Sequence, residues 1–160
     1  MGQAFSPNQF VLKSPRIVTT PPQHDAGLDV HVIFTSFPRT RTALAAAASL
    51  AAGLDVRVTI LAAQVVPYPL SLEEPPVAVD FTEQKLWQMA TEQPSGAAVS
   101  LYLCRDREDT IRQVLRPESV VVIGGRKWWW PSEESHLART LRRDGHRVIL
   151  ASPQPALQKQ

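Results

Sequence analysis

The chain has 160 residues, of which 44% are hydrophobic and 20% are charged, and its formal net charge is +2. This length can bury one good hydrophobic core, and so small a charge without a long basic run argues against a nucleic-acid-binding protein. The single cysteine excludes an internal disulfide, and no apolar run approaches the ~20 residues that a membrane-spanning helix needs. The first residues also lack the pattern of a signal peptide, so we expect a cytoplasmic protein.

Residues 1–28 are predicted to form an extended N-terminal arm. Proline fixes φ and removes a backbone donor, so this segment cannot be a helix or a central strand. Two apolar clusters interrupt its polar sequence, one formed by Phe10, Val11 and Leu12 and one by Ile17 and Val18. The arm is either a disordered tail or a segment that lies on a partner protein with these clusters as anchors.

Residues 29–151 are predicted to form a single α/β domain. The β-branched, nearly continuous apolar run 30–34 is typical of a central parallel strand. Apolar positions at helical spacing follow from about Thr40 to Gly53, and a second strand over 56–63 continues to Val66.

The same alternation continues along the rest of the domain. Capping patterns and apolar runs predict a helix over 81–91, a strand over 97–104, a short helix after Asp106, a strand over 120–123, a helix from Ser132 and a strand over 146–151. Five strands and four helices in this order indicate a five-stranded parallel, doubly wound, Rossmann-like sheet with right-handed crossovers. Residues 152–160 are left as a C-terminal tail.

The segment 124–135 joins the fourth predicted strand to the last helix. In α/β proteins such a junction is where phosphates bind, because glycines and free helix N–H groups meet there. Here two glycines are followed by three tryptophans and then by two carboxylates, Glu133 and Glu134. This composition suggests a former nucleotide-binding site whose residues now have a different function.

Over residues 29–151 the chain resembles the universal stress protein family. The resemblance rests on the segment 32–36 with the alanine-rich helix after it, on the strand 58–67 with its valine–proline end, and on 120–124 with the last helix and strand. It implies the α/β fold of that family. Its nucleotide-binding members carry the signature Gly-x-x-Gly-x9-Gly-Ser/Thr for the phosphates, and an aspartate after the first strand for the ribose.

This sequence departs from that signature at most positions. Gly124 matches the first glycine, but Lys127 and Glu134 stand where the other two belong, and the segment is shorter than the family's spacing. Thr35 stands at the place of the ribose aspartate. If any nucleotide binding remains, the resemblance implies that its contacts fall on Thr35, Val66, Gly124 and Ser135.

These departures predict that the chain does not bind ATP tightly. A side chain in place of a glycine blocks close approach of a phosphate to the backbone. Glu133 and Glu134 would neutralise the positive end of the helix dipole and repel a triphosphate. No histidine pair has metal-ligand spacing and no catalytic set is visible, so we expect neither an enzyme nor a metal or cofactor site. Weak binding of ATP or AMP stays open.

Trp128, Trp129 and Trp130 either fill space above the sheet or form a contact patch, since tryptophan dominates interface hot spots. Anchoring at a membrane–water interface is a third option, although no amphipathic helix lies beside them. We therefore expect an accessory or structural subunit of a larger protein complex, for example on the cytoplasmic face of a photosynthetic or respiratory membrane complex, peripheral to the inner membrane. The alternative is a homodimeric, ATP- or AMP-binding stress regulator that pairs through its last strand, 148–150.

Overall fold

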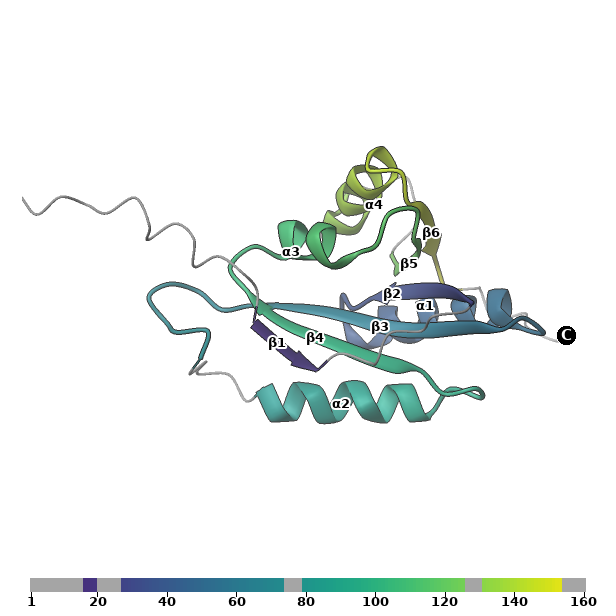
Figure 1. The fold of residues 1–160 in the computed structure, drawn as a ribbon, viewed down its shortest axis with the longest axis horizontal. Helices are drawn as coiled ribbons and strands as arrows, with labels where there is room; N and C mark the ends of the chain where they lie inside the picture. The colour runs from purple at the N-terminus through teal and green to yellow at the C-terminus, as the bar shows by residue number, and fades with distance from the viewer. Residues whose placement is uncertain (1–15, 20–26, 74–78, 126–130, 154–160) are drawn as a thin grey trace, which may run out of the picture.

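The computed structural model describes residues 16–19, 27–73, 79–125 and 131–153, which form one sheet with helices on both faces (Figure 1). The sheet has the strand order β1-β4-β3-β2-β5-β6. Five of its strands are parallel to one another: β2 (Leu28–Ile33), β3 (Val56–Val65), β4 (Ala98–Cys104), β5 (Val120–Gly124) and β6 (Arg147–Ala151). The predicted doubly wound α/β fold with five parallel strands is confirmed.

The sheet also has a sixth strand, β1 (Arg16–Thr19), which the sequence analysis placed in the extended arm. It pairs antiparallel with β4, with Ile17 opposite Tyr102, and the register shifts between Ile17 and Thr19. Prolines on either side of this segment exclude a central strand but allow a short strand at an edge. The sheet therefore begins at residue 16, upstream of the predicted domain limit at residue 29.

The helices divide into two pairs that cover opposite faces of the sheet. α1 (Phe37–Ala51) and α2 (Val79–Thr91) share one core cluster, in which Leu44 and Leu86 are fully buried. α3 (Arg107–Val114) and α4 (Glu133–Arg143) pack with the other cluster. Figure 1 shows α3 and α4 on one side of the sheet and α2 on the opposite side.

Strand β2 shows why its sequence is mostly apolar, with Asp29 and His31 as its polar residues. Successive side chains of a strand point to opposite faces, so Val30 and Val32 enter the α1/α2 core while Ile33 enters the α3/α4 core. Both faces are covered by helices, and a strand in such a sheet has no solvent side that would require polar residues.

The helix starts follow the capping residues in α3 and α4. The Asp106 carboxylate accepts from the amide of Asp109 at 2.9 Å, and the Ser132 hydroxyl accepts from the amide of Ser135 at 3.2 Å. α1 begins at Phe37, three residues before the predicted start, because Pro38 is compatible with the first turn of a helix. Within the described ranges, none of the helices combines the length and the hydropathy that a membrane crossing requires.

Candidate functional site

The candidate site lies where the chain changes direction across the sheet. From β2, the next strands β3 and β4 extend to one side, whereas β5 and β6 extend to the other. Open α/β sheets bind their ligands at the carboxyl ends of the two strands that flank such a switch point. A cavity of about 210 Å³ lies there, next to the first turns of α3 and α4, and its lining includes Thr35, Arg107, Glu108, Glu133, Glu134 and His136.

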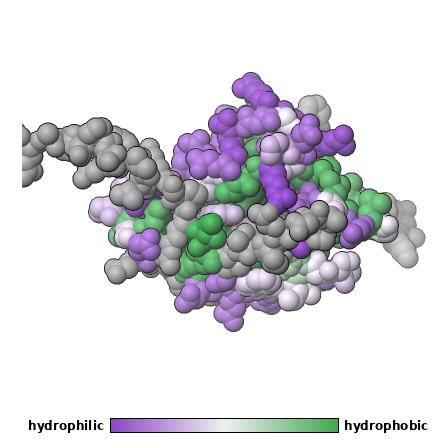
Figure 2. Space-filling model, viewed as in Figure 1, coloured by the Kyte–Doolittle hydropathy of each residue, from purple (hydrophilic) through white to green (hydrophobic). Residues whose placement is uncertain are grey.

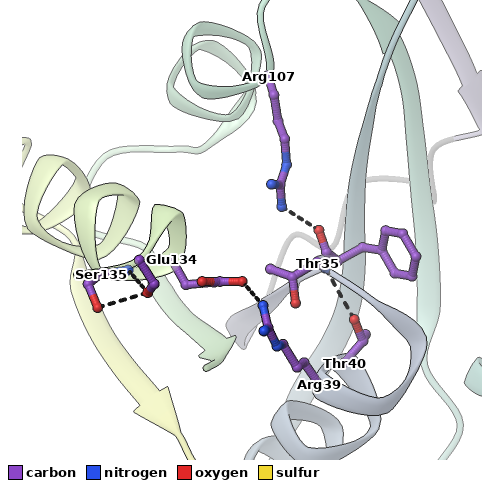
Figure 3. A network of polar contacts seen from close by, with 8 residues as sticks. Thr35, Arg39, Thr40, Arg107, Glu134 and Ser135 are labelled. Carbon is purple, nitrogen blue, oxygen red and sulfur yellow. Dashed lines mark hydrogen bonds and ion pairs between the residues drawn. The ribbon is translucent and has the colours of Figure 1, made fainter. Parts of the chain in front are cut away.

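The dominant feature of this crevice is an ion pair between Arg39, in the first turn of α1, and Glu134, in the first turn of α4 (Figure 3). The Glu134 side chain is 11% exposed. Burial raises the pKa of Glu134, but hydrogen bonds from its own backbone amide and from Ser132, together with Arg39, bring that pKa below its ordinary value. Glu134 is therefore a charged carboxylate at neutral pH.

The Glu134 carboxylate uses the same groups that would otherwise bind a phosphate. The amides of a helix's first turn carry the positive end of its dipole and attract anions, and an arginine adds a full positive charge. Here the first-turn amide of Glu134 and the Arg39 guanidinium both donate hydrogen bonds to the Glu134 carboxylate. The crevice thus contains its own anion.

Gly124, the one glycine in register with the phosphate signature, has a packing role in this fold. It ends β5 beneath the first turn of α1, and a Cβ atom there would overlap the Arg39 carbonyl group, lying 2.6 Å from the carbonyl carbon. At Gly125 an added Cβ would meet its nearest atom, on Leu150, at 3.8 Å, which is ordinary contact. The close approach of helix and strand therefore requires glycine at 124 and not at 125.

Two further hydrogen bonds fix the polypeptide between β2 and α1. The Arg107 guanidinium donates to the carbonyl of Phe34 at 2.6 Å, and the amide of Thr35 donates to the hydroxyl of Thr40 at 3.3 Å (Figure 3). The Thr35 hydroxyl oxygen is itself buried without a hydrogen-bond partner. This hydroxyl therefore has capacity for a further hydrogen bond.

Of the four residues named for residual nucleotide contact, Thr35 is among the residues that line the crevice, and Val66, Gly124 and Ser135 are not. Thr35 lines the crevice, whereas the Ser135 hydroxyl lies 3.1 Å from that of Ser132, and Figure 3 shows Glu134 between Ser135 and Thr35. Val66 is buried after β3, where its amide donates to the carbonyl of Cys104 and its carbonyl accepts from Arg105 at 2.8 Å.

The residues named for partner binding, Phe10, Val11, Leu12, Trp128, Trp129 and Trp130, lie outside the described residues. In the described part of the chain, no group of three or more His, Cys, Asp or Glu side chains could hold a metal ion. The closest acidic and imidazole groups in the crevice, Glu108 and His136, form a pair at 3.2 Å.

Arg39 and Arg107 are site residues that the sequence analysis missed. Arg39 is 95 positions from Glu134, and Arg107 is 73 positions from Phe34. Neither arginine belongs to a local motif, so one sequence carries no signal that joins either of them to its partner.

No family model and no curated protein matches this sequence. Among solved structures, the fold is similar to the crystal structure of a protein from the universal stress protein family from Burkholderia pseudomallei. The two share 18% sequence identity with a TM-score of 0.54, over 80% of this chain and 98% of the other chain. This similarity confirms the predicted universal stress protein-like α/β fold.

Proposed function

We propose that this chain is a non-enzymatic accessory or structural subunit with a universal stress protein-like fold, and that it docks on a larger protein assembly. The observation that carries the proposal is the Arg39–Glu134 ion pair at the N-terminus of α4. It satisfies internally the groups that would recognise a phosphate, at the position where this class of sheet binds ligands. A fold retained without that recognition serves as a platform for protein contacts.

The contact surfaces in this proposal are the N-terminal cluster Phe10–Leu12 and the tryptophans 128–130. The tryptophans lie outside the described residues, and in the sequence they stand between β5 and α4, whose first turn lines the crevice. Large aromatic side chains are the usual anchors of protein interfaces. The host we propose to test first is a photosynthetic or respiratory membrane complex, with this subunit on its cytoplasmic face.

Native purification followed by mass spectrometry tests this proposal with two variants. One carries Trp128→Ala, Trp129→Ala and Trp130→Ala, and the other lacks residues 1–15 but keeps β1. Both should lose the co-purifying assembly while keeping the circular dichroism spectrum of the folded domain. Trp87→Ala, at an exposed position of α2, is the matched control and should change nothing. Retention of the assembly by both variants would contradict the proposal.

A second candidate is a homodimeric nucleotide-binding stress regulator. The observations that favour it are the cavity of about 210 Å³ at the switch point and the position of β6 at the edge of the sheet, where β5 is its one neighbour among the described strands. Calorimetric titration with ATP, ADP and AMP separates the two functions. Micromolar binding by the unmodified chain would favour the regulator and count against the docking subunit.

Glu134→Gln tests the observation that carries the first proposal. The substitution keeps the shape of the side chain but frees the charge of Arg39, so ADP binding should tighten by about tenfold relative to the unmodified chain. Glu133→Gln removes an exposed neighbouring carboxylate that does not pair with Arg39, and its effect should be smaller. Equal binding by the two variants would show that the ion pair is not what excludes the phosphate.

A further inference from the structure

A second and larger cavity lies at the opposite end of the strands, near the amino ends of β3 and β4. Its volume is about 400 Å³, and it lies between the turn that joins α1 to β3 and the turn that joins α2 to β4. Figure 1 shows both turns at the right-hand end of the sheet, away from the crevice at the carboxyl ends of the strands. Nothing in the proposed function uses this cavity.

The inner part of the cavity is apolar. It is lined by Leu44, which is fully buried, by Ala48 and Ala51 of α1, and by Val56 and Val58 of β3. The alanines present single methyl groups toward it, which leaves the space unfilled. The volume falls within the range of small-molecule sites, roughly 300–1,000 Å³.

The rim of the cavity is electrostatically negative. α1 ends at Ala51 and α2 ends at Thr91, and neither helix has a basic residue in its last turn. The C-terminal end of a helix carries a partial negative charge, and here two such ends approach one cavity without the usual compensation. Asp55 is the one ionisable side chain among the described residues that line it.

Arg57 and Arg41 are close in sequence to residues that line the cavity, but neither arginine is among the lining residues. Arg57 lies between Val56 and Val58 in β3, so its side chain starts on the opposite face of the sheet from theirs. Arg41, on α1, pairs with Glu92 at 3.7 Å. An apolar cavity with a negative rim favours a ligand that has an apolar body and a positive end.

From this arrangement we propose that the cavity binds a small amphipathic organic cation, with its alkyl chain among Leu44, Ala48 and Val58 and its ammonium group beside Asp55. The amide and hydroxyl groups of Gln93 and Ser95 lie at the same rim and can accept hydrogen bonds from the ammonium group. An anion with the same alkyl chain is excluded by the charge of the rim.

The full chain should be titrated with hexylammonium chloride and followed by ¹H–¹⁵N correlation spectra, with hexanol and sodium hexanoate as matched ligands. The amides of Gly53 and Gly96 line the cavity and serve as local reporters. Their signals should shift saturably with hexylammonium, several-fold more weakly with hexanol, and not with hexanoate. Equal affinities for hexylammonium and hexanol, shifts confined to residues of the crevice, or no saturable shift would each overturn the proposal.

Two substitutions test the two halves of the cavity separately. Asp55→Asn should weaken hexylammonium binding by about three- to tenfold and leave hexanol binding unchanged. Ala48→Leu should fill the apolar part and abolish the binding of both ligands, whereas Ala45→Leu, at an exposed position of the same helix, should leave both unchanged. Hexylammonium binding that survives Asp55→Asn at full strength would overturn the proposal even if Ala48→Leu failed to fold.

Discussion

Gly124 and Glu134 occupy positions that correspond to the phosphate signature, but the fold assigns both of them internal partners. Gly124 allows α1 to lie against the end of β5, and the Glu134 carboxylate pairs with Arg39 at the start of α4. The comparison with the phosphate motif therefore does not explain why these two residues stand there. Their contacts with α1 and with Arg39 explain it.

Gly124→Ala should destabilise the domain by about 3 kcal/mol, because the added methyl group would overlap backbone, which cannot change rotamer. Gly125→Ala is the matched control and should change the free energy of unfolding by less than about 1 kcal/mol, since its nearest neighbours leave room. Urea denaturation of both variants checks this prediction. Similar losses at the two positions would contradict the packing role of Gly124.

His31 on β2 should make the domain sensitive to mild acid. Burial lowers the pKa of His31 most; Asp29 opposes this, and Arg116 and His146 add to it. The unfolded chain then binds a proton more readily than the folded chain. The contribution of His31 to the free energy of unfolding is therefore fully present above the unfolded pKa, about 6.5. It is lost as the pH drops toward the lower folded pKa.

His31→Gln removes this titration, so the free energy of unfolding should decline less steeply between about pH 6.5 and pH 5 than in the unmodified chain. Urea denaturation at a series of pH values measures the two slopes. Identical slopes would show that another group causes the acid sensitivity.

At the scale of elements, local patterns in the sequence identify most of the fold. The run 30–34 predicts β2, and the capping residues Asp106 and Ser132 predict where α3 and α4 begin. β1 is different, because a four-residue segment among prolines has no period to read. It becomes a strand because the edge of β4 offers hydrogen-bonding partners.

Asp106→Ala should destabilise the domain by about 1 kcal/mol, because the amide of Asp109 loses its side-chain acceptor at the start of α3. Asp109→Ala keeps that cap and removes only an exposed first-turn carboxylate, so its effect should be a few tenths of a kcal/mol. Thermal and urea denaturation compare the two variants. A larger effect of Asp109→Ala would contradict the capping role of Asp106.

At the scale of the whole molecule, two layers of helices enclose the sheet. The crevice lies at the carboxyl ends of the parallel strands, and the larger cavity lies at their amino ends. Figure 2 shows that hydrophilic side chains dominate the upper part of this view, where Figure 1 places α3 and α4. The two cavities lie at opposite ends of the strands. A molecule bound in one of these cavities would therefore not cover the other cavity.

Removal of residues 1–19 should destabilise the domain by about 2 kcal/mol, because it removes β1 and the contact of Val18 with the α1/α2 core. It also uncovers the edge of β4, which is a template for aggregation. Removal of residues 1–15 keeps β1 and should leave the midpoint of thermal unfolding unchanged. Equal midpoints for the two truncated chains would show that β1 contributes nothing to stability.

The α/β class, the five parallel strands, the caps of two helices and the loss of the phosphate signature could all be predicted from the amino-acid sequence. These features depend on local period, on composition and on residues close together in the chain. The edge strand β1, the reason for glycine at 124 and the pairing of Arg39 with Glu134 became visible in the folded structure. Each of those depends on a contact between distant segments, and a single sequence does not record which distant segments meet.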